Sequence, residues 1–236
     1  EFFVDESGNW SASFAGEFDL QPGDQVWVRT ENRDGHETNV NLGLPSVEVH
    51  FRNYDWLQGY MTANSNVHLT LWAEYGTVVK GWRDVGSDGD GRFWADIYDV
   101  AGNCCVGISP GDTLELSDGA QTVVIPITEI SGVVDSAEDT FSGHVSGAAC
   151  PASVRVDIWS PFWAEGADIL TDENCDYFYD FSPNYDVGVG QWANIWYRMP
   201  DGHSLGAVFS ELRLDADQTG DWVWGIVAPN ATVNFT

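Results

Sequence analysis

The residues best suited to chemistry in this chain are the carboxylates of one short acidic run. Asp84, Asp88 and Asp90 stand in the run Asp-Val-Gly-Ser-Asp-Gly-Asp-Gly, which spaces hard oxygen ligands along a loop. Calcium prefers carboxylate and carbonyl oxygens of this kind. The run lacks a closing bidentate glutamate, and Asp-Gly steps are also common in plain turns. The sequence therefore predicts calcium as the ion this loop would hold, with an ordinary turn as the alternative.

The four cysteines are Cys104, Cys105, Cys150 and Cys175. No Cys-x-x-Cys pair occurs and histidine is sparse nearby, so the spacing does not indicate a zinc site. Four cysteines allow three connectivities. We expect a Cys150–Cys175 bridge, because both residues fall at turns of one predicted domain, and we leave the pairing of Cys104 and Cys105 open.

Three Asn-x-Ser/Thr tripeptides begin at Asn9, Asn230 and Asn234. Such tripeptides are acceptors for N-glycosylation when they lie on the surface of a secreted protein. All three fall in the terminal parts of the chain. Together with the cysteines, they predict an extracellular or cell-surface location.

The sequence offers little for catalysis. It contains no nucleophile elbow and no phosphate-binding loop. Its 37 acidic residues make chance carboxylate pairs inevitable, so such pairs carry no catalytic information. The histidines are scattered, and two of them, His36 and His203, occupy equivalent Asp-Gly-His turns, which indicates a structural role. We expect a protein that is not an enzyme and holds no organic cofactor.

The charge is strongly negative, with 37 acidic residues against 9 basic ones and a net charge of −28. This balance argues against nucleic acid or an anionic membrane as a partner. No apolar run approaches the roughly 20 residues of a membrane helix, so we expect no membrane insertion. The sequence does not open on a basic segment followed by an apolar run, and we expect any signal peptide to have been removed.

Short alternating runs, separated by Gly, Pro, Asp and Asn, predict strands rather than helices along the whole chain. In the segment 9–14, for example, Trp10, Ala12 and Phe14 fall on one face of the predicted strand. The spacing of the turns gives about seven strands per unit, which is typical of a β-sandwich. The expected fold class is therefore all-β.

Two patterns repeat along the chain. One is a strand interrupted by glycine at Gly59, Gly143 and Gly225. The other is an Asp-containing turn before an aromatic strand, at 5–14, 88–97 and 172–181. Repeats fix the architecture, and here they indicate tandem small domains.

The order of the two patterns defines the expected domains. Residues 46–126 and 127–213 each form a complete sandwich, whereas 1–45 is the back half of a unit and 214–236 is the front half. The linkers around Leu44-Pro45 and near Ile127 are short. We therefore expect neighbouring units to stack into a rod.

The two terminal halves would form a third sandwich if they were joined. Each half alone would leave an open strand edge and an apolar face in water. The aromatic residues expected in this contact are Phe2, Phe3, Trp10, Phe14, Trp27, Trp222, Trp224 and Phe235. Head-to-tail completion between copies gives a filament. Completion within one copy gives a ring, and a chain cut from a longer repeat protein is the third alternative.

These motifs resemble the tandem immunoglobulin-like repeats of bacterial and archaeal surface proteins. In that family a strand-Gly-strand opening leads to an Asp-x-x-Gly turn, a Pro-Gly-Asp turn and an Asp-Gly close. The resemblance covers nearly the whole chain and implies β-sandwiches in a stalk, adhesin or filament. Residues 127–213 depart from it, because Cys175 stands where glycine is usual.

Carbohydrate binding is the main rival function. Exposed indole rings stack on sugars, and the tryptophans that could point away from the cores are Trp72, Trp94, Trp163, Trp192 and Trp196. They are spread over the repeats rather than clustered. This spread favours packing at domain or subunit contacts, with the chain itself as the main partner and glycans as the alternative.

Overall fold

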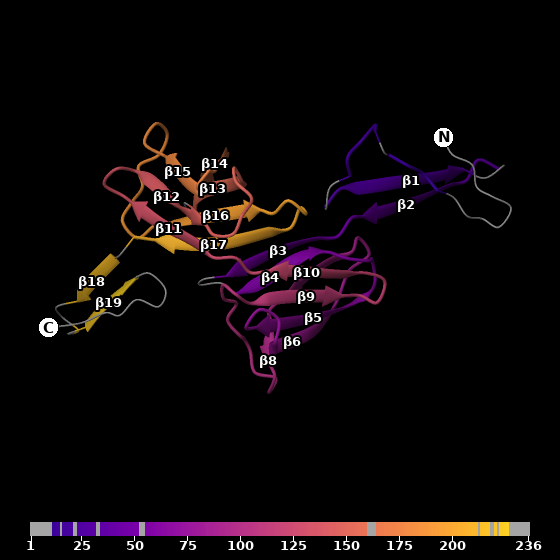
Figure 1. Ribbon diagram of the computed structural model, residues 1–236, viewed down its shortest axis with the longest axis horizontal. Helices are drawn as coiled ribbons and strands as arrows, with labels where there is room; N and C mark the ends of the chain where they lie inside the picture. Colours follow the sequence, from indigo (N-terminus) through magenta and orange to yellow (C-terminus); the bar gives the residue numbers. More distant parts are fainter. Residues whose placement is uncertain are drawn as a thin grey trace.

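The computed structural model describes most of the chain, namely residues 11–14, 16–20, 23–31, 34–51, 55–159, 164–211, 213–217, 220 and 222–226. All regular secondary structure in these residues is strand, arranged in five sheets (Figure 1). The expected all-β class is therefore confirmed. The described residues contain no helix that is long and apolar enough to cross a membrane.

The first complete unit is a sandwich of two sheet regions. One region contains β3 (Ser46–Phe51), β4 (Trp56–Tyr60) and β7 (Arg92–Ala95). The other has the order β10-β9-β5-β6-β8, formed by β5 (Asn66–Ala73), β6 (Val78–Gly86), β8 (Tyr98–Asp99), β9 (Thr113–Ser117) and β10 (Thr122–Pro126). Side chains from both regions alternate into a common core.

The second complete unit repeats this plan. One sheet has the order β11-β12-β15, formed by β11 (Ile130–Asp135), β12 (Thr140–Val145) and β15 (Asp176–Asp180). The other region has the order β14-β13-β16-β17, formed by β13 (Ser153–Trp159), β14 (Ala164–Leu170), β16 (Trp192–Arg198) and β17 (Ser204–Ser210). Phe141 of β12 and Phe209 of β17 join the two layers, with ring centroids 5.8 Å apart.

The two complete units share one continuous sheet. β17 of the second unit pairs in parallel with β3 of the first, with Ser204 opposite Glu48 and Ala207 opposite Phe51. The result is a seven-stranded sheet, β14-β13-β16-β17-β3-β4-β7, and one connected hydrophobic core. We call the β17–β3 pair the seam. The units therefore lie side by side and not end to end as the short linkers suggested, because pairing satisfies two strand edges that stacking would leave open.

Three hairpins carry a glycine as the fourth residue of their second strand, and we call them opening hairpins. They are β3–β4, β11–β12 and β18–β19, the last formed by Arg213–Asp217 and Trp222–Ile226. In each, one glycine of the second strand faces the first strand: Gly59, Gly143 or Gly225. A side chain at Gly59 or Gly143 would strike a carbonyl oxygen of the paired strand. This close approach explains the repeated strand-Gly-strand pattern.

Three closing hairpins share an Asp-Gly turn. They are β9–β10, β16–β17 and β1–β2, the last formed by Gln25–Glu31 and Glu37–Gly43. The turn glycines Gly35, Gly119 and Gly202 have φ angles of +79°, +84° and +79°. Glycine adopts this left-handed conformation without steric cost, so the turn repeats wherever the Asp-Gly step does.

The terminal segments contribute one closing hairpin, β1–β2, and one opening hairpin, β18–β19. Each forms a two-stranded sheet of its own within the described residues. They lie on opposite sides of the two sandwiches (Figure 1). The strands of the complete units fall within 46–126 and 127–213, while β18 already begins at Arg213. The three boundaries between the four expected domains stay predictions.

Candidate assembly surfaces

A histidine secures the end of the seam. The backbone N–H of Val47 donates a hydrogen bond to Nδ1 of His203, at 3.2 Å. The turn before β17 holds this ring, because the backbone N–H of His203 in turn donates to the carboxylate of Asp201 at 3.3 Å. Burial lowers the pKa of His203 although Asp201 opposes this effect. The ring is therefore neutral near pH 7, which leaves Nδ1 able to accept the hydrogen bond.

An aromatic ladder crosses the outer face of the seam. His50 of β3 stacks on Trp56 with ring centroids 3.5 Å apart and meets the edge of Trp196 at 4.1 Å. Gly206 of β17 leaves room for this arrangement, since a Cβ there would lie 2.7 Å from the Trp196 ring. Trp196 is one of the tryptophans predicted to point away from the cores. It lies on this outer face, outside the buried core, and its ring packs against His50 of the neighbouring unit.

The imidazole of His50 is shut away from water by these rings. The residue is only 8% exposed, and its Nε2 has no hydrogen-bond partner among the described residues. Burial lowers the pKa of His50 to about 3. The seam therefore contains a histidine that its packed surroundings keep in the neutral form near pH 7.

Two of the aromatic residues expected in self-assembly are exposed. Trp27 of β1 is 69% exposed and Phe14 also faces solvent. Of the other residues expected in self-assembly, Trp222 and Trp224 lie in β19, where only their backbone is described. Phe2, Phe3, Trp10 and Phe235 lie outside the described residues.

A shallow aromatic groove opens on the free face of β5 and β6. It has a volume of about 370 Å³ and is lined by His68, Thr70, Trp72, Val79 and Trp82. The Trp82 side chain is 46% exposed. Sequence reasoning missed Trp82, although its position one residue after the inward Gly81 of β6 could have revealed its outward face.

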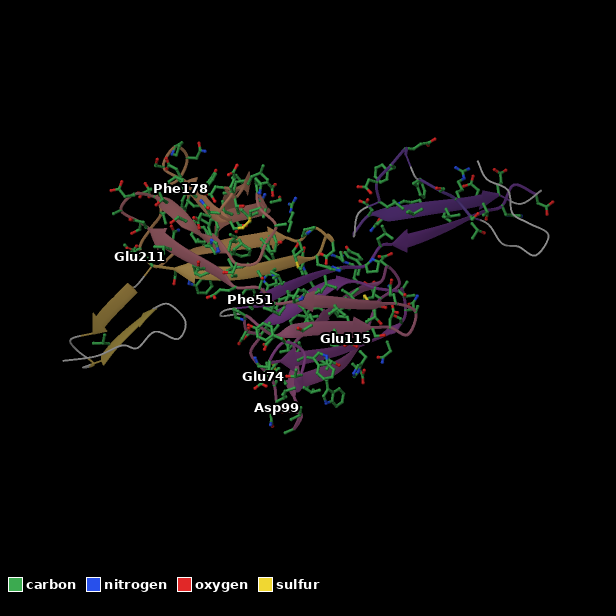
Figure 2. All side chains as sticks on the ribbon, viewed as in Figure 1. Phe51, Glu74, Asp99, Glu115, Phe178 and Glu211 are labelled. Carbon is green, nitrogen blue, oxygen red and sulfur yellow. A yellow bond between two sulfur atoms is a disulfide. The ribbon has the colours of Figure 1, made fainter. Side chains whose placement is uncertain are left out.

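Two of the remaining tryptophans predicted to point outward lie on strands of different units. Trp94 is 54% exposed on β7 and Trp192 lies at the start of β16. Trp163 lies outside the described residues. Figure 2 shows another exposed aromatic, Phe178, on the side of the second unit away from the first.

The candidate calcium ligands have partners within the protein. Asp84 binds Nδ1 of His68 at 2.7 Å. Oδ1 of Asp88 accepts the backbone N–H groups of Asp90 and Arg92 at 2.9 and 2.8 Å, which closes the turn before β7. In the described residues, the three aspartates do not form a cluster with metal-ligand spacing. Calcium binding here stays a prediction, beside a structural role for Asp88.

The second unit builds the same turn with a disulfide. Oδ1 of Asp172 accepts the N–H groups of Asn174 and Asp176, and hydrogen bonding, first from Asp176, lowers the pKa of Asp172. Cys175 takes the left-handed position, at φ +70°, that Gly91 takes in the first unit at +84°. This geometry explains why glycine is usual at that position.

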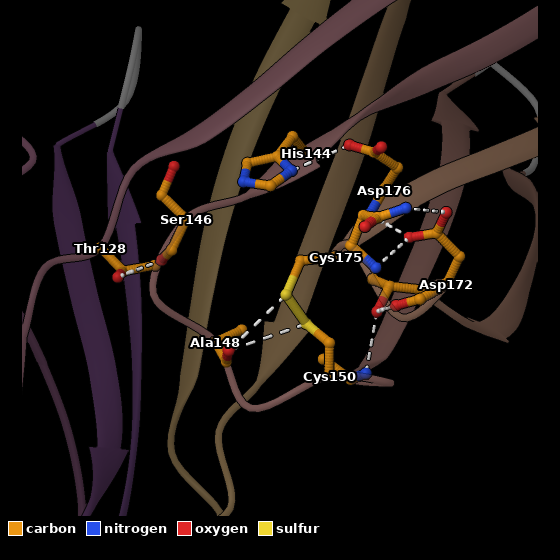
Figure 3. Close-up of a disulfide and its surroundings, with 11 residues drawn as sticks. Thr128, His144, Ser146, Ala148, Cys150, Asp172, Cys175 and Asp176 are labelled. Carbon is orange, nitrogen blue, oxygen red and sulfur yellow. Dashed lines mark hydrogen bonds and ion pairs between the residues drawn. A yellow bond between two sulfur atoms is a disulfide. The ribbon is translucent and has the colours of Figure 1, made fainter.

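Cys175 forms a disulfide with Cys150, with a Cα–Cα distance of 5.4 Å (Figure 3). Both sulfur atoms lie 3.6–3.7 Å from the carbonyl oxygen of Ala148. The bond links the loop before β13 to the turn before β15. The adjacent Cys104 and Cys105 form the other disulfide, so none of the four cysteines is free.

The three glycosylation candidates, Asn9, Asn230 and Asn234, all lie outside the described residues. They stay predictions. The extracellular location that they suggested therefore depends here on the disulfides and on composition.

Comparisons with known proteins find no matching family model and no matching curated protein. Solved structures give weak likenesses. A biofilm-associated protein, BSP domain, shares 14% identity at a TM-score of 0.25, over 72% of this chain and 29% of that chain. Chicken CNTN1 FN1–FN3 domains share 10% identity at a TM-score of 0.24, over 79% of this chain and 75% of that chain. Likeness at this level carries no information about what this chain binds.

Proposed function

We propose that this chain is a non-catalytic extracellular structural protein whose copies assemble head to tail into a filament or stalk. The observation that supports the proposal is the nature of the terminal hairpins. β18–β19 is an opening hairpin and β1–β2 is a closing hairpin, and each stands as a two-stranded sheet within the described residues. One copy therefore presents the half that another copy needs.

The complete units show how such halves fit. In the second unit, the opening hairpin β11–β12 and the closing hairpin β16–β17 belong to facing layers, and Phe141 and Phe209 meet between them. A two-stranded hairpin is at best marginally stable alone in water. Packing the β18–β19 face on β1–β2 of another copy would supply the missing layer and cover Trp27, and burial of an aromatic side chain contributes about 2–3 kcal/mol.

The separation of the terminal hairpins favours contact between copies over a ring. They lie on opposite sides of the molecule (Figure 1). A contact between two different surfaces of identical copies propagates when the rotation does not close. The disulfide pairing of all four cysteines supports an extracellular setting for this assembly.

Deletion of residues 214–236 tests the proposal. Negative-stain electron microscopy and sedimentation velocity should show long assemblies for the full chain and only folded, short species for the deletion variant. Circular dichroism reports whether the two sandwiches stay folded. Trp94→Ser, which changes an exposed tryptophan outside the hairpins, is the matched control and should assemble normally. Long assemblies that survive the deletion, or a full chain that stays monomeric at every concentration, contradict the proposal.

The aromatic groove supports a second candidate function, binding of a neutral polysaccharide. Its Trp72, Trp82 and His68 rings form an apolar surface, and Thr70 adds a hydroxyl group. Affinity electrophoresis in gels that contain neutral glycans tests this function. Trp82→Ala should remove retardation, whereas Trp159→Ala, an exposed tryptophan on another sheet, should preserve it. Equal migration of all variants with and without glycan excludes the groove as a sugar site.

A further inference from the structure

We propose a second contact between copies: β2 of one copy adds in parallel to the free edge of β11 in another. The inference rests on the proposed function, in which β18–β19 of one copy and β1–β2 of another form a third sandwich. It names the strand edge that this third sandwich would pair with. It starts from the seam, where the second strand of a closing hairpin, β17, pairs with the first strand of an opening hairpin, β3. The occupant is a second copy of this chain.

β11 is the counterpart of β3, with an open edge. Gly132 faces Gly143 in β11–β12 as Val47 faces Gly59 in β3–β4, so the two strands share one register. β11 is the last strand of its sheet within the described residues, whereas β3 has β17 on that side. Val133, which corresponds to Glu48 of the seam, is 66% exposed. An exposed valine on an unpaired edge is a feature that strand addition would cover.

β2 is the counterpart of β17, with the same histidine. His36 follows Asp34-Gly35 as His203 follows Asp201-Gly202. The third closing hairpin has Ala120 at this position, and its second strand, β10, lies at a sheet edge within the described residues. Of β17 and β10, the strand that follows a histidine, β17, is paired in the seam, and the strand that follows an alanine, β10, is at an edge. β2 also follows a histidine, His36, and we therefore take β2 as the strand that pairs with another copy.

The seam register fixes the contacts of the proposed pair. Glu37 would lie opposite Val133 and Thr38 opposite Val134, as Ser204 lies opposite Glu48 and Leu205 opposite Val49. Nδ1 of His36 would accept the backbone N–H of Gly132, as His203 accepts that of Val47. The charge of Glu37 does not oppose this approach, because Arg29 of the same hairpin pairs with it.

Cross-linking between two differently tagged full-length variants tests the register. Glu37→Cys in one copy and Val133→Cys in the other should give a heterodimer with a short bis-maleimide, since the native cysteines are all in disulfides. Gln121→Cys, at the equivalent position just before β10, is the matched control and should cross-link to Val133→Cys at least about 10-fold less. Equal yields from both pairs, or no heterodimer in samples that sedimentation shows to be assembled, overturn the inference while the proposed function stands.

Two further variants separate the alternatives. His36→Ala should lower the cross-linking rate about 2- to 10-fold, as expected for loss of one hydrogen bond, and His36→Asn should keep it by retaining an acceptor oxygen. A chain that carries both cysteines should cross-link between copies in proportion to concentration. Concentration-independent cross-linking within single chains would overturn the assignment to a second copy. Samples that neither assemble nor cross-link would reject the proposed function together with the inference.

Discussion

The seam and the terminal hairpins use the same kinds of strand but end in different states. At the seam, a closing hairpin meets an opening hairpin of the same chain, and backbone pairing, a buried histidine and a shared core close both edges. At the terminal hairpins, the corresponding strands pair only within their own hairpin in the described residues. The difference teaches that the same kind of strand can close an edge within the chain or leave it open, and that the chain connection gives the seam a high effective concentration of its two strands.

The largest expected effect is on the closed region. Phe51 is fully buried beside Ala207 at the seam. Phe51→Ala should lower the free energy of unfolding by about 3–5 kcal/mol, because it leaves a cavity where two units share a core. Chemical denaturation checks this value. If the parent chain already showed two separate unfolding transitions, the two units would unfold independently. The seam would then not couple them, contrary to its description as a closed contact.

Adding a side chain at Gly206 tests whether the rings of the aromatic ladder are tightly packed. Gly206→Val would drive a side chain into the Trp196 ring and should cost about 1–3 kcal/mol. Gly43→Ala, in β2, is the matched control, because a Cβ there meets no atom within 4 Å. Thermal unfolding of both variants measures the difference. Equal melting temperatures would show that the ladder is not packed as described.

Acid should weaken the seam before it weakens the open hairpins. Burial holds the folded-state pKa of His50 at about 3, below its ordinary value of 6.5. The unfolded state therefore binds more protons between these values, and stability that is complete above pH 6.5 falls by at most about 1.4 kcal/mol per pH unit below it. Unfolding curves from pH 7 to 4 test this slope. His50→Phe should reduce this slope but not abolish it, because burial also lowers the pKa of His203. An unchanged slope in that variant would assign the effect to other groups.

The smallest expected effect on unfolding belongs to the open region. Trp27→Ala should change the free energy of unfolding by less than about 0.5 kcal/mol, because the side chain is exposed in the single copy. The same variant should shift sedimentation profiles toward smaller species. If the variant instead unfolded more easily but assembled normally, Trp27 would stabilise the fold of the single copy and would not contribute to contacts between copies.

Part of the candidate site followed from sequence and part did not. The equivalence of His36 and His203 was visible in their Asp-Gly-His turns, and it predicted a structural role. Nothing in the sequence indicated that His203 accepts a hydrogen bond from Val47, because that contact joins residues 156 positions apart. The alternation along the strand placed Trp196 on an outer face of the sheet, but it did not show that His50 of the neighbouring unit lies against that face.

The sequence by itself determined the local structure of this protein. Alternating side chains set the strands, Asp-Gly steps set the closing turns, and single glycines set the register of the opening hairpins, because each depends on neighbouring residues or a tight steric limit. Only the tertiary structure decided that β17 lies beside β3 and that the two complete units form one sheet. Strand edges expose the same backbone groups whatever their sequence, so the choice of partner depends on which edges the fold brings together.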